Sequence, residues 1–290
     1  MYRNGLELLK LTEELNCTIA EILYKKEDEY CDKPQKMVHN NTKEILKVMR
    51  NSSQAAIDHP EEYMGHIIGG DAKKMNDYSK TKTYSGSFIT KAMARAFSSS
   101  EVNASMGKIC AAPTAGSCGI LPAALFTAEE QLGLDEESLI NGLLTSAVIG
   151  EIITMNATVS GAEGGCQAEC GSAAAMAAGM LVILKDGTPE QALNASAIAL
   201  KNIMGLVCDP IAGLVEAPCA KRNASGVVNA MISADMSLAG VKSIIPFDEV
   251  VDAMFKVGKA LPITLKETAL GGIAKSKTAQ VIQNEIYKRD

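Results

Sequence analysis

Tryptophan is absent from the 290-residue sequence, and aromatic residues make up only 4% of it. A core without large rings must be filled by aliphatic, Ala and Met side chains, which pack best where helices approach closely. No stretch of useful length shows the period-2 alternation of a half-buried strand. The sequence therefore predicts an all-α fold: a single large helical domain of closely packed Ala-rich and Gly-rich helices, with Gly-rich loops between them.

A surplus of positive charge is also missing, since the formal net charge is -6. Lys and Arg are scattered among acids and form no basic stripe that would neutralise phosphates, so we expect no nucleic-acid partner. The longest uncharged run, residues 109–128, has the length of a membrane span, but Pro and Gly residues interrupt it as a helix, so a buried loop and helix start is expected there. The first residues lack the apolar region and cleavage site of a signal peptide. These absences predict a cytoplasmic protein with no membrane partner.

Apolar residues near the start of the chain recur at steps of three and four: Leu8, Leu11, Leu15, Ile19 and Ile22. This spacing predicts one amphipathic helix. Residues 27–82 are polar and weakly periodic except around Thr42 to Met49, which predicts short helices joined by surface loops. Beyond Ser85 the composition shifts to Ala, Gly, Met and Ile. We therefore expect an N-terminal segment, residues 1–84, packed on a helical core, residues 85–290, as one continuous domain.

Three helix starts carry clear signals. Asp135 precedes two glutamates and an apolar run, and a carboxylate there accepts otherwise unpaired amide bonds. Thr188-Pro-Glu-Gln191 is a capping box with Pro at the first helical position, and the helix is expected to run through Met204 and stop at Gly205. A further helix is expected from Phe247 to Val257, ending at Gly258.

The eight cysteines lie at positions 17, 31, 110, 118, 166, 170, 208 and 219. In a reducing compartment they do not form a disulfide framework, so metal binding, catalysis or burial must explain them. Residues 160–171 and 205–219 place cysteines beside Gly and Pro, which allow close approach to a bulky anionic group and fix the loop that holds it. The intervals between Cys166, Cys208 and Cys219 match no zinc-finger, ferredoxin or redox spacing, so a metal site and buried free thiols both stay open.

Several long segments closely resemble the iron-sulfur L-serine dehydratase alpha-chain family. They are Gly69-Gly-Asp-Ala-Lys-Lys74, Glu101-Val-Asn-Ala-Ser105, Ala112-Pro-Thr-Ala-Gly-Ser-Cys-Gly-Ile-Leu-Pro122, Gly164-Gly-Cys-Gln-Ala-Glu169 and the segment from Gly205 to Asn223. The resemblance implies that Cys166, Cys208 and Cys219 hold a 4Fe-4S cluster with one open iron, and that Cys110, Cys118 and Cys170 are structural.

The resemblance also implies a reaction, in which L-serine is converted to pyruvate and ammonia without pyridoxal phosphate. The enzyme must remove an unactivated α proton and expel hydroxide, so it must stabilise charge that develops on oxygen. An iron that lacks a protein thiolate is the expected site for the hydroxyl and carboxylate of the substrate.

Polar residues in the same motifs are candidates for holding the substrate carboxylate or ammonium: Lys73, Asn103, Thr114, Ser117, Lys221, Arg222 and Asn223. Arg222 has the planar fork that suits a carboxylate. The alternative is that Lys73 and Lys221 are solvated charges and that Thr114 caps a helix. Glu163, Glu169 and Asp209 lie beside the cysteines, either as the catalytic base or as groups that hold a ligand in place, and the sequence does not rank them. The three histidines are expected to be surface groups.

Single-chain members of the resembled family carry an additional Ser-Ser-His-Thr segment that is absent here, which implies a separate beta subunit. Their cluster can also bind a cysteine near the C-terminus, whereas residues 281–290 contain none. Two other readings remain: a lyase resembling cysteine desulfidase, with a thiol leaving group, and a zinc-stabilised helical subunit without catalysis.

Overall fold

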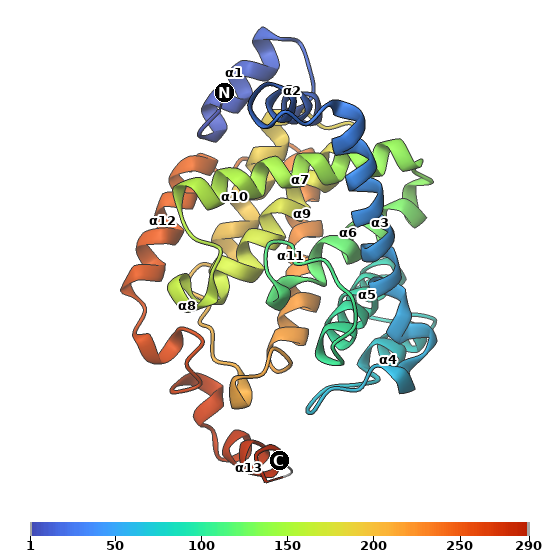
Figure 1. The fold of residues 1–290 in the computed structure, drawn as a ribbon, viewed down its shortest axis with the longest axis vertical. Helices are drawn as coiled ribbons and strands as arrows, with labels where there is room; N and C mark the ends of the chain where they lie inside the picture. The colour runs from blue at the N-terminus through green and yellow to red at the C-terminus, as the bar shows by residue number, and fades with distance from the viewer. Residues whose placement is uncertain (1, 289–290) are drawn as a thin grey trace.

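A computed structural model of the chain describes residues 2–288, and in this range it contains thirteen α-helices and no β-strand (Figure 1). The predicted all-α fold is confirmed. Met1 and the last two residues of the cysteine-free tail lie outside the described range. One main hydrophobic core extends from Tyr2 to Met254, so the N-terminal helices share it with the later ones. The division at residue 84 stays a prediction.

The centre of the molecule is α9 (Ser172–Ile183), which packs against α6 (Ile120–Leu132), α7 (Glu136–Asn156), α10 (Pro189–Asn202) and α11 (Cys219–Leu238). Five of its twelve residues are Ala, and nearly all of it is buried. Small side chains let these helices approach closely: a Cβ on Gly179 would lie 2.2 Å from Ile149 Cδ1 on α7. The predicted close packing of Ala-rich helices therefore lies here, and the cysteine-bearing segment 160–171 leads directly into it.

The prediction of one unbroken helix that includes Leu8 to Ile22 is wrong. The structure has two helices there, α1 (Gly5–Glu14) and α2 (Ile19–Cys31). Asn16 adopts a left-handed backbone conformation with φ 44°, and Thr18 begins α2 with a capping box to Glu21. The apolar spacing continues across this turn because both helices bury their apolar residues in the same core.

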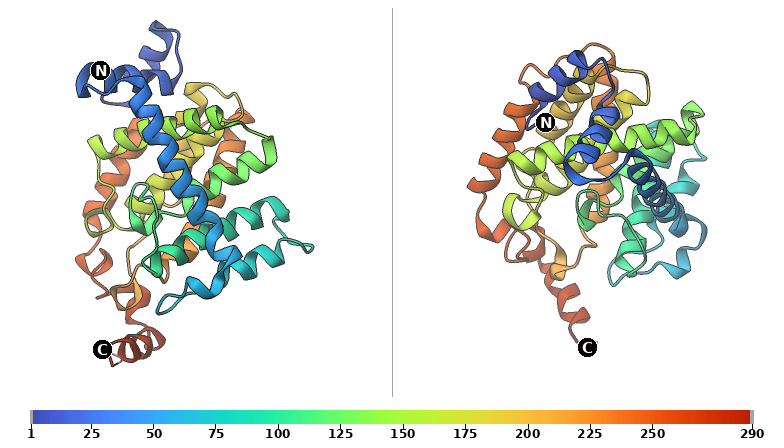
Figure 2. Two further views of the ribbon diagram at one scale, coloured as in Figure 1. Left: turned by 45° about the vertical axis from the view of Figure 1, so that its right-hand side comes forward. Right: turned by 45° about the horizontal axis from the view of Figure 1, so that its top comes forward.

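The polar region 27–82 is also more regular than predicted, because α3 (Gln35–Asp58) runs through much of it. Figure 2 shows this helix crossing the outside of the molecule. It has no apolar run, yet it buries one face that includes Leu46 and Met49. The shorter α4 (Asp71–Tyr78) packs with α3 against α5 (Gly86–Ala104), around a second small hydrophobic cluster.

The three predicted helix starts are confirmed, but two ends differ. Asp135 accepts a hydrogen bond from the Ser138 amide at the start of α7, and the predicted Thr188 capping box begins α10. α10 ends at Asn202, before the expected stop. α12 (Phe247–Ala260) runs through Gly258, where a Cβ would lie 2.9 Å from the Gly164 backbone, so this glycine serves a close helix contact rather than a helix end.

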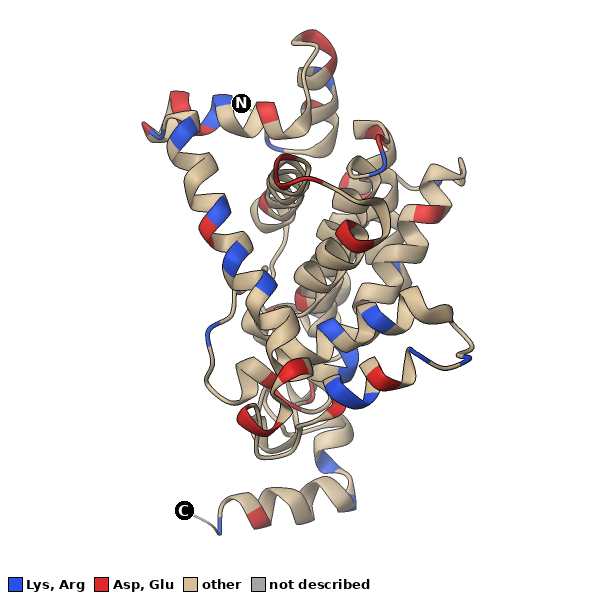
Figure 3. Ribbon diagram, turned by 90° about the vertical axis from the view of Figure 1, so that its right-hand side faces the viewer, with Lys and Arg blue, Asp and Glu red and all other residues tan. Residues whose placement is uncertain are grey.

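The run 109–128 forms the predicted loop and helix start, with the short turn η2 (Ala115–Ser117) before α6. The helix α7 is long and apolar enough to cross a membrane by length and composition alone. It is mostly buried inside the protein, as core helices are, so one such helix is weak support for a membrane span. Figure 3 shows Lys and Arg interleaved with Asp and Glu along the helices in view.

After α12 the chain runs alongside the loop that contains Cys208. It then continues into α13 (Lys277–Ile286), which extends away from the body at the bottom of Figure 1. Residues 263–275 of this segment form two short turns, η5 (Ile263–Leu265) and η6 (Gly272–Lys275). They contact the cysteine loop rather than the main core, so the C-terminal segment belongs to the candidate site.

Candidate functional site

Cys166 lies at the junction between a Gly-rich turn and the central helix. The short α8 (Gly161–Gly164) is followed by Gly165, whose φ of 78° and closeness to the Leu206 carbonyl exclude a side chain. Cys166 then precedes a π-helical turn, η3 (Gln167–Gly171), which continues into α9. π-helical turns inside helices are frequent at functional sites. The backbone here is thus fixed by the molecule's most buried helix.

Cys208 and Cys219 lie at the two ends of the loop that leads into α11. The Cys208 amide donates to the Leu265 carbonyl at 2.9 Å, and its carbonyl accepts from the Glu267 amide at 2.7 Å, so the C-terminal segment pairs with the cysteine's backbone on both sides. Cys219 is the first residue of α11, directly after Pro218. Helices and hydrogen bonds thus hold both thiols in place.

The three predicted ligand thiols are buried and lie within electrostatic reach of one another. Burial, together with charge on Cys166 and Glu169, raises the pKa of the Cys219 thiol to about 12. Burial also raises the pKa of Cys208 far above its ordinary value, with added repulsion from Glu169 and Cys166. Cys208 and Cys219 therefore resist becoming thiolates unless a cationic group neutralises them, as a metal does when it deprotonates its thiol ligands.

Cys170 differs from its neighbour Cys166. Their Sγ atoms lie 3.4 Å apart. The hydrogen bond with Cys170 lowers the pKa of Cys166, whereas the same hydrogen bond, with full burial, raises the pKa of Cys170 well above its ordinary value. The pKa of Cys166 is thus held below that of its fully buried neighbour Cys170. The roles of ligand for Cys166 and structural thiol for Cys170 stay predictions.

The spacing of these thiols does not fit a single metal ion. Two thiolates on one tetrahedral zinc lie about 3.8 Å apart, given Zn–S bonds of about 2.3 Å. Among residues 2–288, the one set of three ligand atoms found within 4.8 Å of one another is the exposed group His59, Glu61 and Glu62. Cys166, Cys208 and Cys219 form no such set, so their sulfur atoms as placed do not surround a single ion.

Glu169 is the acid that faces this thiol cluster. Its Oε1 accepts a hydrogen bond from the Thr114 hydroxyl at 2.8 Å, and its Oε2 lies 3.7 Å from Cys208 Sγ. Burial raises the pKa of the Glu169 carboxyl, although the bond from Thr114 opposes the shift. A Cβ on Gly116 or on Gly161 would lie 2.9 or 2.6 Å from its carboxylate oxygens, so two glycines from different loops make room for it.

The loop that carries Thr114 is joined to the cysteine loop by Asn223. The buried Asn223 side chain donates to the carbonyls of Gly116 and Cys219, at 2.7 and 2.9 Å, and accepts from the Gly119 amide at 2.8 Å. Ser117 is buried in the same turn, 3.2 Å from the Thr114 hydroxyl. Asn223 is thus fully occupied by backbone groups, and Thr114 is the member of this set closest to Glu169.

Arg222 and Asp209 form a mostly buried ion pair at the same site, with 2.7 Å between Nη2 and Oδ1. Arg222 also donates to the Val207 carbonyl at 2.8 Å. The second Asp209 oxygen accepts from the Ile273 amide at 2.7 Å. Each carboxylate oxygen of Asp209 therefore has a protein partner, so its role as catalytic base stays a prediction.

Four other candidates lie away from the thiols or at the surface. Lys73 pairs with Asp77 on the exposed side of α4, and Lys221 is exposed and pairs with Asp71. Asn103 lies half-buried near the end of α5. Glu163 is exposed and accepts from the Thr158 hydroxyl. The arrangement of the two lysines is that of solvated charges.

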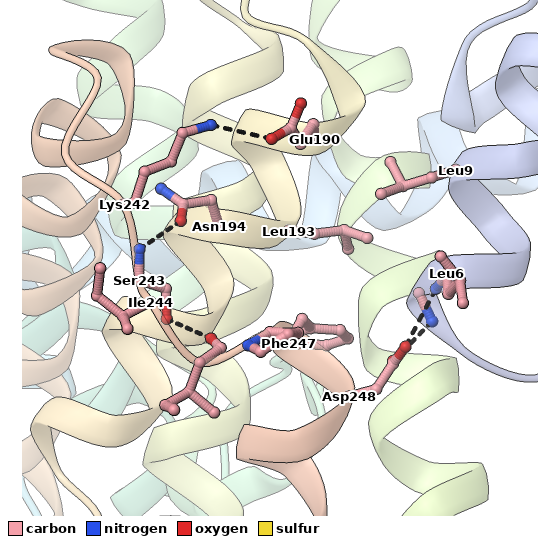
Figure 4. Close-up of a pocket in the computed structure, with 13 residues that line it drawn as sticks. Leu6, Leu9, Glu190, Leu193, Asn194, Lys242, Ser243, Ile244, Phe247 and Asp248 are labelled. Atoms are coloured by element: carbon pink, nitrogen blue, oxygen red, sulfur yellow. Dashed lines mark hydrogen bonds and ion pairs between the residues drawn. The ribbon is translucent and has the colours of Figure 1, made fainter.

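The structure also contains an apolar groove of about 390 Å³ between α1, α10 and residues 242–248 (Figure 4). Its polar groups are bonded to one another: Lys242 with Glu190, Ser243 with Asn194, and Asp248 with the amides that begin α1. It contains none of residues 160–171 or 205–219. The reactive groups thus lie elsewhere.

Sequence reasoning did not identify three features of the site. Glu169 was one of several unranked acids, Glu216 was not singled out, and residues 263–275 had no assigned role. Glu216 is buried, and its carboxylate binds the backbone of residues 66–68. Nothing in a single sequence separates a buried acid from a solvated one, although Gly272, which leaves room for Asp209, marks a close approach.

These features define a helical protein with a buried site that contains several thiols and a carboxylate. The model of the serine dehydratase alpha-chain family matches residues 14–274, and the chain belongs to this family. It is 48% identical over 289 residues to the L-serine dehydratase alpha chain of Peptoniphilus asaccharolyticus, covering 99% of each chain. It is 35% identical over 284 residues to the L-serine dehydratase of Streptomyces coelicolor, covering 94% of this chain and 60% of that protein. It is 33% identical over 294 residues to the L-serine dehydratase of Mycobacterium bovis, covering 97% of this chain and 63% of that protein.

Proposed function

We propose that the chain is the cluster-bearing subunit of an L-serine ammonia-lyase, which converts L-serine to pyruvate and ammonia. The observation that carries this proposal is the convergence of Cys166, Cys208 and Cys219, each from a family motif, on one buried site beside Glu169. Full-length similarity to the L-serine dehydratase alpha chain supports the choice of substrate.

Cys166, Cys208 and Cys219 would hold a 4Fe-4S cluster. When bound, it supplies an iron without a protein thiolate, which acts as a Lewis acid toward the substrate oxygen. Cys170 keeps its proton and stabilises the charge on Cys166. The burial of all four thiols keeps bulk water away, which strengthens electrostatic interactions in the site.

The substrate would bind against Glu169 and Thr114. Once Cys208 gives up its proton to become a ligand, Glu169 Oε2 has no thiol hydrogen to accept and becomes available to the ammonium of serine, while Thr114 fixes Oε1. Loss of the α proton and of the β-hydroxyl as water leaves an aminoacrylate. This tautomerises to an imine, and a water molecule hydrolyses it to pyruvate and ammonia, so the water released is taken up again. The reaction needs no electron acceptor.

Arg222 would act on the protein rather than on the substrate. Its guanidinium already binds Asp209 and the Val207 carbonyl, and its charge favours the thiolate of Cys166. A substrate carboxylate would have to compete with Asp209 for the same fork. We therefore assign Arg222 to holding the cysteine loop.

We also propose that a second chain completes the enzyme, in the cytosol, where free thiols stay reduced. The chain covers 99% of an alpha-chain relative but 60% and 63% of two relatives named simply L-serine dehydratase. The remaining part of those relatives is where a partner's contribution is expected.

The test is turnover after anaerobic cluster assembly, with the chain alone and with a co-expressed beta chain. Pyruvate formation from L-serine, well above that from L-cysteine, supports the proposal. Faster turnover of L-cysteine would replace it with a desulfidase. Loss of turnover in Glu169→Gln, with iron retained, would support the role of that carboxylate.

A further inference from the structure

The loop between Cys208 and Cys219 carries two buried acids, one near each end of the loop. Asp209 follows Cys208 directly, and Glu216 lies three positions before Cys219. Both are almost fully buried, with 2% and 3% exposure, which is rare for acids unless they are paired. Each reaches out of the loop to a segment far away in sequence.

Glu216 binds three consecutive backbone amides of the N-terminal region. Its Oε1 accepts from His66 at 3.1 Å, and its Oε2 accepts from Ile67 and Ile68 at 2.7 and 3.1 Å. Gly65 makes room for this contact, since a Cβ there would lie 2.4 Å from Glu216 Oε2. Bonds from amides to a buried carboxylate are charge-assisted and about twice as strong as neutral ones.

Asp209 makes the corresponding contact with the C-terminal region. Its Oδ2 accepts from the Ile273 amide at 2.7 Å, and its Oδ1 accepts from Arg222 at 2.7 Å. Gly272 lies against it with φ 61°, and a Cβ there would lie 2.1 Å from Oδ2. A glycine opposite each acid shows that both contacts depend on close backbone approach.

We propose that Asp209 and Glu216 are positioning residues that anchor the Cys208–Cys219 loop at its two ends, to residues 272–273 and 66–68, and so preset the positions of the two thiols before a cluster binds. The proposal rests on the ligand roles proposed for these cysteines. It assigns a purpose to two segments that carry no ligand themselves. Neither acid touches the substrate in this account.

Thiol labelling of the full chain without its cluster tests the proposal. The probe is N-ethylmaleimide under anaerobic conditions, with labelling rates read at each cysteine by peptide mass spectrometry. Asp209→Asn should speed labelling of Cys208, and Glu216→Gln that of Cys219, each about tenfold, because one charge-assisted bond is lost from the local opening equilibrium. The exposed Cys31 is the internal reference. Glu190→Gln, in an exposed ion pair with Lys242, is the control that should change neither rate.

Gly272→Ala and Gly65→Ala displace the same carboxylates without removing their charge, and they serve where an acid variant does not fold. Each should raise the labelling rate of the same thiol as its acid partner. Unchanged labelling of Cys208 and Cys219 in folded variants would overturn the proposal. If only the enzyme assignment is wrong, the labelling rates of Cys208 and Cys219 change in the variants as predicted, but the chain does not turn over L-serine after cluster assembly.

Discussion

Arg222 binds the Asp209 carboxylate and the Val207 carbonyl with the two ends of its guanidinium, at 2.7 and 2.8 Å. These two residues flank Cys208 in the sequence. One side chain from α11 therefore fixes the backbone on both sides of a proposed cluster ligand. The same helix begins at Cys219, so α11 links two of the three thiols.

Replacing Arg222 by Ala should lower the free energy of unfolding of the cluster-free chain by about 3 kcal/mol, because Asp209 is left buried without its partner. Arg222→Lys keeps the charge but loses the planar fork, so its free energy of unfolding should lie between those of the wild type and Arg222→Ala. Urea titration measures both. Lys242→Ala, which breaks an exposed ion pair, is the control and should cost no more than about 1 kcal/mol. Equal losses for Arg222→Ala and the control would show that the pair does not stabilise the site.

Glu101 gives a stability prediction that depends on pH. It is fully buried on α5 and accepts from the Asp71 and Ala72 amides, while its Oε2 has no hydrogen-bond partner. Burial raises the pKa of its carboxyl above the ordinary 4.5, despite those amide bonds. The folded state therefore holds the proton more tightly than the unfolded state. The stability that this proton contributes is present at low pH and is lost as pH rises from about 4.5 through the folded pKa.

Glu101→Gln removes this titration and keeps an acceptor for the amides of α4. The free energy of unfolding of the variant, minus that of the wild type, should rise with pH across this window and then level off. Urea titrations at a series of pH values measure the difference. A difference that is flat, or that falls with pH, contradicts the burial argument.

Gly161 is predicted to tolerate no side chain. A Cβ would lie 2.6 Å from Glu169 Oε2 and 3.1 Å from Cys208 Sγ, so Gly161→Ala must move both groups. Overpacking of this kind costs about 1–3 kcal/mol, and bound iron should fall with it. Gly171→Ala is the matched control, because its Cβ would approach no atom closer than 3.3 Å. Urea titration and iron analysis of the two variants compare them directly, and equal behaviour would mean that the site is looser than described.

The helices that were predicted well have local signals. Thr188-Pro-Glu-Gln191 and Asp135 satisfy helix amides with their own side chains, so neighbours in sequence specify these starts. The break at Asn16 was missed because apolar spacing continues through it, and α3 was missed because its packing face is narrow and partly polar. Tertiary contacts, rather than propensity, decide the length of α3, whereas the break before α2 has a local signal in the capping box of Thr18 and Glu21.

The candidate site was predictable in its cysteines only through family resemblance. Their spacing along the chain has no meaning by itself, because a π-helical turn and two loops bring them together. Asp209 was left open between catalytic base and a group that holds a ligand in place, because its bond from Ile273 comes from a residue 64 positions away in the chain. The role of Glu216 also depends on distant residues, because its hydrogen-bond partners lie in the N-terminal region.

Metal and sulfide analysis of the anaerobically assembled chain tests the central claim most directly, when repeated on single Cys→Ala variants. The account predicts about four irons and four sulfides per wild-type chain. It predicts loss of both in Cys166→Ala, Cys208→Ala and Cys219→Ala, and retention in Cys170→Ala. One zinc per chain without sulfide, or a Cys170→Ala variant that loses iron as the other three do, would contradict it.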